Sequence, residues 1–117
     1  MQKLNKDLEK IIEGFAEKAD KETPYPYKVF SAKRISEDDG RQIYSLEVNV
    51  WDQGQYYSRA ESIMDALEKK LHRCNLLTEE YLLCFFKGQR QPIDDPDKTI
   101  KRIREQFEMH VFEREDE

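Results

Sequence analysis

The sequence predicts an α+β fold, with a small, mostly antiparallel sheet of about four strands packed against two main helices, in the order helix, hairpin, helix, two strands. Apolar and polar residues alternate in two segments, 41–52 and 103–113. This period of two is typical of a half-buried strand. Between these segments, apolar residues at 60–71 recur every three or four positions, which predicts a helix.

Residues 1–24 are expected to form a first helix and a proline-containing connection. The apolar residues at helical spacing are Leu4, Leu8, Ile11, Ile12, Phe15, Ala16 and Ala19. This stripe predicts an amphipathic helix over 3–19. Pro24 and Pro26 lack a backbone N–H and fix φ, so the helix is expected to end before them.

A β-hairpin is predicted over residues 27–51. Its first strand spans 27–35, and the acidic tract at 36–40 supplies the turn, because Asp and Gly accept the backbone angles of a reversal. The second strand places one set of side chains on one face of the sheet: Tyr44, Leu46, Val48 and Val50. The opposite face carries Ile43, Ser45, Glu47 and Asn49.

A second helix is predicted from about 59 to 73. Ser58 and Glu61 have the spacing of a capping box, in which each side chain bonds to the other residue's backbone amide. The apolar residues that follow at helical spacing are Ala60, Ile63, Met64, Leu67 and Leu71. The pattern therefore gives this helix both a start and a buried face.

The C-terminal part is predicted to hold two further strands. Segment 81–86 is apolar and aromatic enough for a buried strand, although so short a run also fits a helix. Its glycine and prolines make 88–97 a loop. A helical turn at 97–102 is expected to lead into a strand at 103–113, although Ile100, Ile103, Phe107 and Val111 also fit a helical stripe.

Length and charge limit the other possibilities. The 117 residues are expected to form one domain, with an α+β body at 25–113 and a frayed acidic tail at 114–117. The net charge of −5 argues against a dedicated nucleic-acid-binding protein. Apolar runs are far shorter than the roughly 20 residues of a membrane span, and the charged N-terminus is not a signal peptide. Both observations favour a soluble intracellular protein.

No enzymatic role is expected, and no catalytic, cofactor-binding or metal-binding residue is assigned. His72 and His110 are expected at the surface or its boundary. Cys74 and Cys84 lack the spacing of a metal site, so buried free thiols are favoured over a redox pair. The carboxylates of Asp94, Asp95 and Asp97 lack the spacing of a calcium loop, which favours a turn over a cation site.

One basic patch stands out in the sequence. It consists of Lys98, Lys101, Arg102 and Arg104, with Arg90 as a possible extension. Asp97 and Glu105 interrupt it, which favours ion pairs between subunits or a solvated strand face over contact with DNA.

Two longer passages carry a resemblance to a known class of proteins. SLEVNVWDQGQYYSRAESIMDALEKKL and KRIREQFEMHVFERE resemble tail-terminator and tail-completion (head–tail joining) minor tail proteins of long-tailed bacteriophages and prophages. The resemblance covers roughly residues 25–115. It implies a ring-forming subunit, usually in a hexamer, at the head-proximal end of the tail tube, where it stops tail polymerisation or joins the tail to the capsid connector.

The same resemblance implies partners and a place. The partners would be further copies of this chain, the tail tube protein and the head–tail connector protein, with no membrane, no specific nucleic acid and no cofactor. The protein would lie in the bacterial host cytoplasm during assembly and in the virion tail afterwards. The alternative is a small dimeric α+β adaptor or regulatory domain that binds a protein partner.

Aromatic residues near predicted loops are candidates for an interface, because such side chains are enriched at interface centres. The interface candidates are Tyr25, Tyr27, Trp51, Tyr56, Tyr57, Arg102 and Arg104. A purely structural interpretation is equally open: Trp51 then covers the edge of the core, and Tyr56 packs on the second helix.

Overall fold

The computed structural model describes residues 2–19, 22–38, 40–72 and 75–113. Its elements are α1 (Gln2–Ile12), β1 (Phe15–Ala16), β2 (Tyr27–Asp38), β3 (Arg41–Gln53), α2 (Ser58–Leu71), β4 (Asn75–Leu77), β5 (Tyr81–Ile93) and β6 (Ile100–Glu113). The strands form one six-stranded sheet in the order β1-β2-β3-β6-β5-β4. The β1–β2 pair is parallel, and the other pairs are antiparallel.

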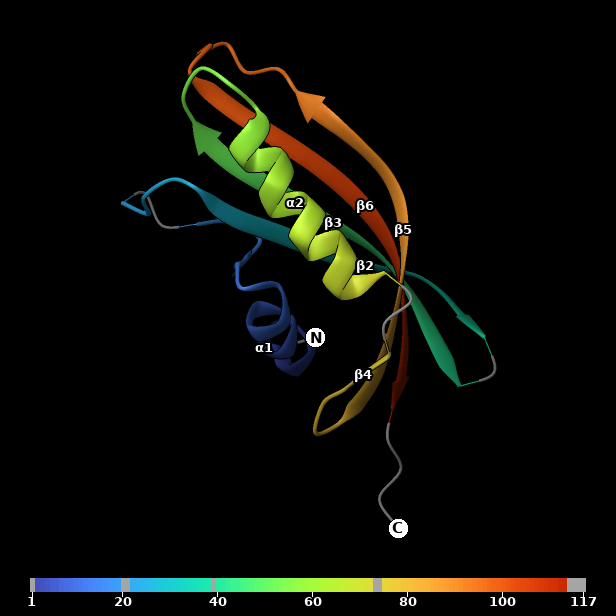
Figure 1. Cartoon of the computed structure of the whole chain (residues 1–117). Coiled ribbons are helices and arrows are strands. Elements are labelled where there is room, and N and C mark those ends of the chain that lie inside the picture. The colour runs from blue at the N-terminus through green and yellow to red at the C-terminus, as the bar shows by residue number, and fades with distance from the viewer. Residues whose placement is uncertain (1, 20–21, 39, 73–74, 114–117) are drawn as a thin grey trace.

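The expected sheet of about four strands packed against two helices is wrong. Strand residues dominate the described chain, and the six strands curl into a half-barrel (Figure 1). Four of them are 12 to 14 residues long, so the natural twist of each strand accumulates into strong curvature. The two short strands β1 and β4 lie at the edges, where the sequence pattern gave no signal for them.

Both helices cover the same face of this sheet, which we call the inner face (Figure 1). The buried side chains that the strands contribute to it alternate along each strand, as expected for a period of two. The buried hydrophobic core comprises Leu4, Leu8, Ile12, Phe30, Ala32, Tyr44, Leu46, Val48, Val50, Ala60, Met64, Leu67, Leu71, Leu83, Phe85, Ile103, Phe107, Met109 and Val111. In the described part of the chain, the opposite, outer face carries no helix (Figure 1).

The first helix is shorter than predicted, and the segment after it is extended. α1 ends at Ile12, and Glu13 takes a left-handed conformation with φ of 59°. Gly14 then passes so close to β2 that a Cβ there would lie 2.8 Å from the Lys28 carbonyl oxygen. Phe15 and the following residue pair with β2 as the edge strand β1. The helical stripe expected over 3–19 is therefore wrong beyond residue 12.

The hairpin prediction is confirmed, with strands longer than expected. β2 continues to Asp38 and β3 begins at Arg41, so the turn is short and contains Gly40 with φ of +75°. Tyr44, Leu46, Val48 and Val50 are buried on the inner face, as their alternation predicts.

The second helix is confirmed, but its predicted capping box does not form. The N-cap residue is Tyr57, which makes no side-chain capping bond. Glu61 instead directs its carboxylate to Arg90 on β5, with a distance of 2.9 Å between Nη1 and Oε2. The start of α2 is held by Asp52, which is buried at the end of β3 and accepts hydrogen bonds from Arg59. This pairing with Arg59 lowers the pKa of Asp52.

The C-terminal half departs from prediction at two places. β5 continues through the expected loop to Ile93, and β6 already begins at Ile100, where a helical turn was expected. The chain between them is a turn in which the Asp97 carboxylate accepts a hydrogen bond from the Thr99 backbone, at 2.9 Å. The strand predicted for 103–113 is confirmed. The predicted frayed tail at 114–117 lies outside the described residues, as does Cys74, whereas Cys84 is half-buried.

A bulge in β5 determines which of its side chains face α2. Lys87 pairs with Phe107, yet the next pairing joins Arg90 to Glu105, so β5 holds one extra residue here. Without that residue Arg90 would point to the outer face. Gly88 permits the bulge, because a Cβ at this position would lie 2.8 Å from the Gln106 carbonyl oxygen.

We therefore expect Gly88→Ala to lower the free energy of unfolding by about 1–3 kcal/mol, the usual cost of overpacking. Urea denaturation would measure the loss. Gln89→Ala, a change at the neighbouring exposed position, should stay within about 0.5 kcal/mol of the parent protein. Equal stabilities for the two variants would show that the bulge has room for a side chain.

Candidate interaction surface

The outer face carries a row of aromatic side chains at one end of the sheet. Tyr27, Trp51 and Arg102 lie opposite one another on β2, β3 and β6. The rings of Tyr25 and Tyr27 stack with centroids 5.3 Å apart, and those of Tyr27 and Trp51 stack at 6.3 Å. Phe15 meets Tyr27 edge-on at 6.5 Å. We call Phe15, Tyr25, Tyr27, Trp51 and Arg102 the aromatic ladder.

Arg102 extends the aromatic ladder to the next strand. Its guanidinium carbon lies 4.7 Å from the centroid of the Trp51 ring, which is cation–π geometry. Each such contact, and each aromatic pair, stabilises a fold by about 0.5–1.5 kcal/mol. Burial raises the pKa of Tyr27. The ladder thus contributes to stability while part of it stays at the surface.

A polar network continues from the ladder along the outer face. Arg102 donates from Nε to the Asn49 side-chain oxygen at 2.9 Å. Asn49 in turn donates to Glu47 at 3.2 Å, and Arg104 lies 3.7 Å from the same Glu47 carboxylate. Both predicted interface arginines therefore have partners within their own chain.

The structure brings together only some of the predicted interface residues. Tyr25, Tyr27, Trp51 and Arg102 form one cluster with Arg104 beside it. Tyr56 lies apart on the link before α2 and is 73% exposed. Tyr57 packs against the core, and the Lys101 ammonium lies 5.3 Å from its ring centroid. Sequence reasoning missed Phe15. The predicted alternation of β3 was correct, and it places Glu47 and Asn49 on the outer face with Trp51.

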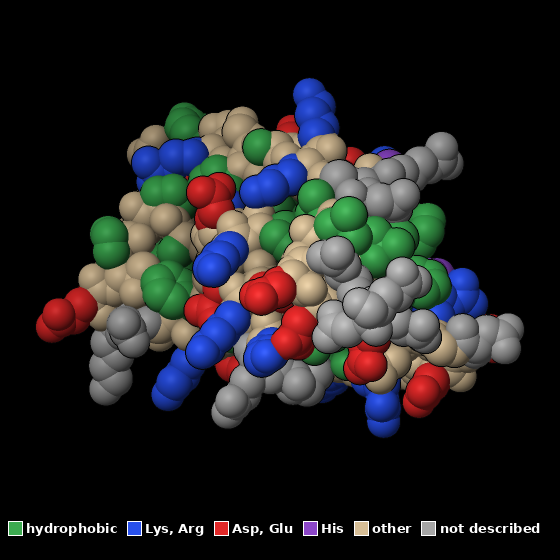
Figure 2. Space-filling view, turned by 90° about the horizontal axis from the view of Figure 1, so that it is seen from below, with side chains coloured by type: hydrophobic (Ala, Val, Ile, Leu, Met, Phe, Trp, Pro, Cys, Tyr) green, Lys and Arg blue, Asp and Glu red, His purple; other side chains and the backbone are tan. Residues whose placement is uncertain are grey.

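A second exposed patch occupies the other end of the outer face. Leu77, Leu82 and Phe112 lie opposite one another on β4, β5 and β6. Phe86 lies four residues further along β5 and contacts His110, with ring centroids 5.0 Å apart. Leu77 is 69% exposed and Phe86 is 40% exposed. We call these five residues the distal patch. Figure 2 looks at the end of the fold where α1 and β4 lie, and it shows hydrophobic side chains grouped there between charged ones.

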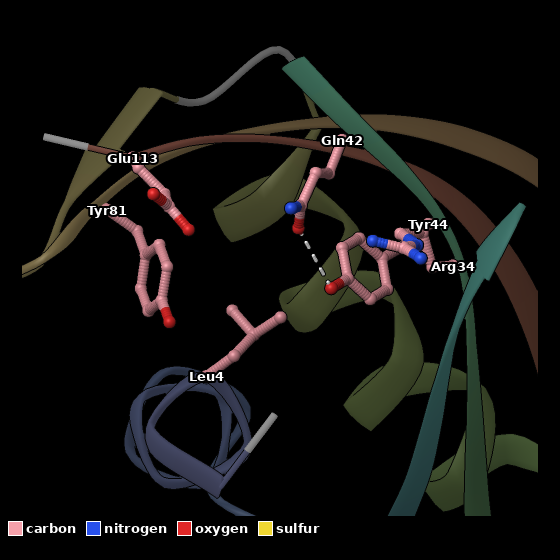
Figure 3. A pocket seen from close by; sticks show the side chains of 6 residues that line it. All are labelled: Leu4, Arg34, Gln42, Tyr44, Tyr81 and Glu113. Carbon is pink, nitrogen blue, oxygen red and sulfur yellow. Dashed lines mark hydrogen bonds between the residues drawn. The ribbon is translucent and has the colours of Figure 1, made fainter. Parts of the chain in front are cut away.

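A hollow of about 450 Å³ lies where the inner face runs past α1 (Figure 3). It is lined by Leu4, Arg34, Gln42, Tyr44, Tyr81 and Glu113. Tyr44 donates its hydroxyl proton to the Gln42 side-chain oxygen at 3.1 Å. Along β3 the inner face changes here from apolar to polar, so the hollow marks the solvated end of the core.

Beneath α2 lies an ion cluster that sequence reasoning did not anticipate. Arg90 lies within 2.9 Å of four carboxylates, those of Glu61, Asp65, Glu68 and Glu105. Glu105 was expected on a solvated face or between subunits, and this is wrong, because it is fully buried and pairs within its own chain. Arg90 likewise faces α2 and does not extend the basic patch of Arg102 and Arg104.

Within the described ranges, no three or more His, Cys, Asp or Glu side chains are grouped so that they could hold a metal ion. No helix among the described residues is long and apolar enough to cross a membrane.

Comparisons with known proteins bear on the fold alone. No protein family matches the sequence, and no curated protein matches it. A solved structure described as "Virion of native gene transfer agent (GTA) particle" contains a chain of similar fold, with a TM-score of 0.67 and 15% sequence identity. The match covers 92% of this chain and 84% of that chain. The curled sheet and its two helices are thus an arrangement that another protein also adopts.

We expect Tyr27→Ala to lower the free energy of unfolding by about 1–3 kcal/mol, because it removes a half-buried ring with three aromatic neighbours. Thermal or urea denaturation would measure the loss. Tyr56→Ala is the matched control and should change stability by less than about 0.5 kcal/mol. A neutral Tyr27→Ala would contradict a structural role for the ladder.

Proposed function

We propose that this chain is a structural component of a phage-like virion. The observation that carries the proposal is the likeness in fold, over nearly the whole chain, to a chain of a gene transfer agent virion. The resemblance of its two longer sequence passages to minor tail proteins supports the same conclusion independently. A structural role requires no catalysis, so we propose that the protein is not an enzyme.

Within the virion, we propose a ring-forming subunit at the head-proximal end of the tail tube. There it would terminate tail polymerisation or join the tail to the capsid connector. Its partners would be further copies of itself, the tail tube protein and the connector protein. This finer assignment rests on the sequence resemblance.

The two ends of the outer face suit such an assembly. A closed ring is held by heterologous contacts, in which two different surfaces of each subunit meet. The aromatic ladder combines stacked rings with Arg102, whereas the distal patch combines aliphatic side chains with Phe86 and His110. They lie at opposite ends of one uncovered face and differ in chemistry. Each subunit therefore offers two dissimilar exposed patches of the kind that head-to-tail contacts need.

Light scattering across a wide concentration range, with negative-stain imaging of the largest species, tests the proposal. Rings of about six subunits would support the ring assignment. A strict dimer at every concentration would contradict it and favour the dimeric adaptor. If the chain is monomeric, capture by assembled tail tubes becomes the deciding measurement, because a subunit of this kind can close into a ring on the end of a tube.

We expect Trp51→Ala to weaken self-assembly more than it lowers thermal stability, because it removes the centre of the exposed ladder. Light scattering and thermal melting of the same sample would measure both effects. Trp51→Phe keeps an aromatic ring and should retain most of the assembly. Tyr57→Ala should mainly lower stability, because Tyr57 packs against the core. Normal assembly by a Trp51→Ala protein that melts many degrees lower would make the ladder purely structural.

A further inference from the structure

A carboxylate occupies a position in the core where the alternation of β6 calls for an apolar side chain. Glu105 lies between Ile103 and Phe107 on the inner face and is 0% exposed. On either side of it in the sheet are Val48 of β3 and Arg90 of β5. A buried ionised carboxylate is costly unless its charge is balanced and its oxygens are hydrogen-bonded.

The hydrogen bonds satisfy only half of this carboxylate. Arg90 donates from Nε to Oε1 of Glu105 at 2.6 Å. The second oxygen, Oε2, is buried and has no hydrogen-bond partner among the described residues. Arg90 makes no second bond to Glu105, since its Nη1 donates to Glu61 and Asp65 and its Nη2 donates to Glu68 on α2.

The charges around Glu105 are not balanced either. From α2 it is faced by Glu61, Asp65 and Glu68, and from β5 by Arg90 and Lys87, whose ammonium lies 3.4 Å from Glu68. On β3 its partner in the sheet register is the apolar Val48. Four carboxylates thus share two cations. A proton on Glu105 removes the one negative charge that is fully buried.

We propose that Glu105 is a proton-binding site that controls how firmly α2 is held against β5 and β6. With a proton, Glu105 is a neutral core side chain that still accepts the Arg90 hydrogen bond, and Arg90 is shared among the three carboxylates of α2. Without a proton, the buried charge repels those carboxylates and competes with them for Arg90. The contact between α2 and the sheet is then weaker.

The electrostatics agree with this geometry. Burial is the main cause that raises the pKa of Glu105, Arg90 lowers it and Glu68 raises it, and together they bring this pKa to about 7. The pKa of Glu68 is lowered, first by its interaction with Glu105 and then by Arg90. The proton of the pair therefore belongs to Glu105 and the negative charge to Glu68.

The sign of the pH dependence follows from this shift. An ordinary glutamate pKa is 4.5, and the folded chain raises it for Glu105 to about 7. The native state thus binds the proton more tightly than the unfolded state. The stabilisation is fully present below pH 4.5 and is lost as the pH rises through 7. Groups with lowered pKa values, such as Glu68 and Asp52, lose their contribution at acidic pH, outside this window.

The test compares the parent protein with Glu105→Gln, which is neutral, has the same shape and keeps an oxygen for Arg90. Urea denaturation at pH 5 and pH 8 gives the unfolding equilibrium constant of each protein. Between these pH values we expect the constant of the parent to rise at least about tenfold relative to that of the variant. A ratio that does not change with pH, or changes in the opposite direction, would overturn the proposal and make Glu105 a permanently ionised partner of Arg90.

Two further measurements keep the test decisive. Glu68→Gln removes the neighbouring negative charge, so the pH window of this variant should lie at lower pH than that of the parent protein. In the unmodified chain, amide hydrogen exchange in α2, corrected for the intrinsic effect of pH, should be faster at pH 8 than at pH 6, relative to exchange in β3. Equal protection of α2 at both pH values would overturn the proposal even if Glu105→Gln does not fold.

Discussion

The two central strands, β3 and β6, pair without a register shift from Arg41 opposite Phe112 to Gln53 opposite Ile100. A slip of one residue in either strand would turn its buried side chains to the outer face, which neither helix covers. The pairing therefore fixes which side chains α1 and α2 meet. The two register shifts in the sheet lie in the long strands that flank this pair, between Arg34 and Ser36 in β2 and between Lys87 and Arg90 in β5. The flanking strands can re-aim side chains there while the central pair keeps its phase.

Where the fold follows a simple period, the sequence was sufficient to predict it. The hairpin, the second helix and the last strand each bury one regular set of side chains, and each was predicted, although the last segment also fits a helical stripe. The pattern failed where two periods coincide or where a strand contains unusual residues. Phe15 continues the apolar stripe of α1 but lies in an edge strand. Gly88 and Pro92 are typical of loops, yet a bulge accepts the first and an edge strand tolerates the second. The curvature of the sheet leaves no periodic pattern in the sequence from which it could be predicted.

The candidate sites divide in the same way. The aromatic ladder was partly predictable, because Tyr27 and Trp51 share a face once the hairpin register is known. The cluster beneath α2 was not predicted, because Glu105 is charged and follows a run of charged residues, although it shares the phase of the buried Ile103 and Phe107. Its burial depends on Arg90, and Arg90 faces inward only because of the bulge at Gly88. A single extra residue in β5 thus decides whether a glutamate in the neighbouring strand can be buried.

The edges of the sheet bear on how copies of this chain would meet. β1 covers only Val29 and Phe30 of β2, and β4 covers only 82–84 of β5. Among the described residues, the rest of both edges lacks a neighbouring strand. These stretches contain the two bulges, several charged side chains and Pro92. Such features disfavour the addition of a further strand. Contacts through side chains of the outer face do not meet this obstacle, and the exposed aromatic and aliphatic groups lie on that face. If copies of this chain assemble, side-chain contacts through the outer face are therefore favoured over strand pairing at the edges of the sheet.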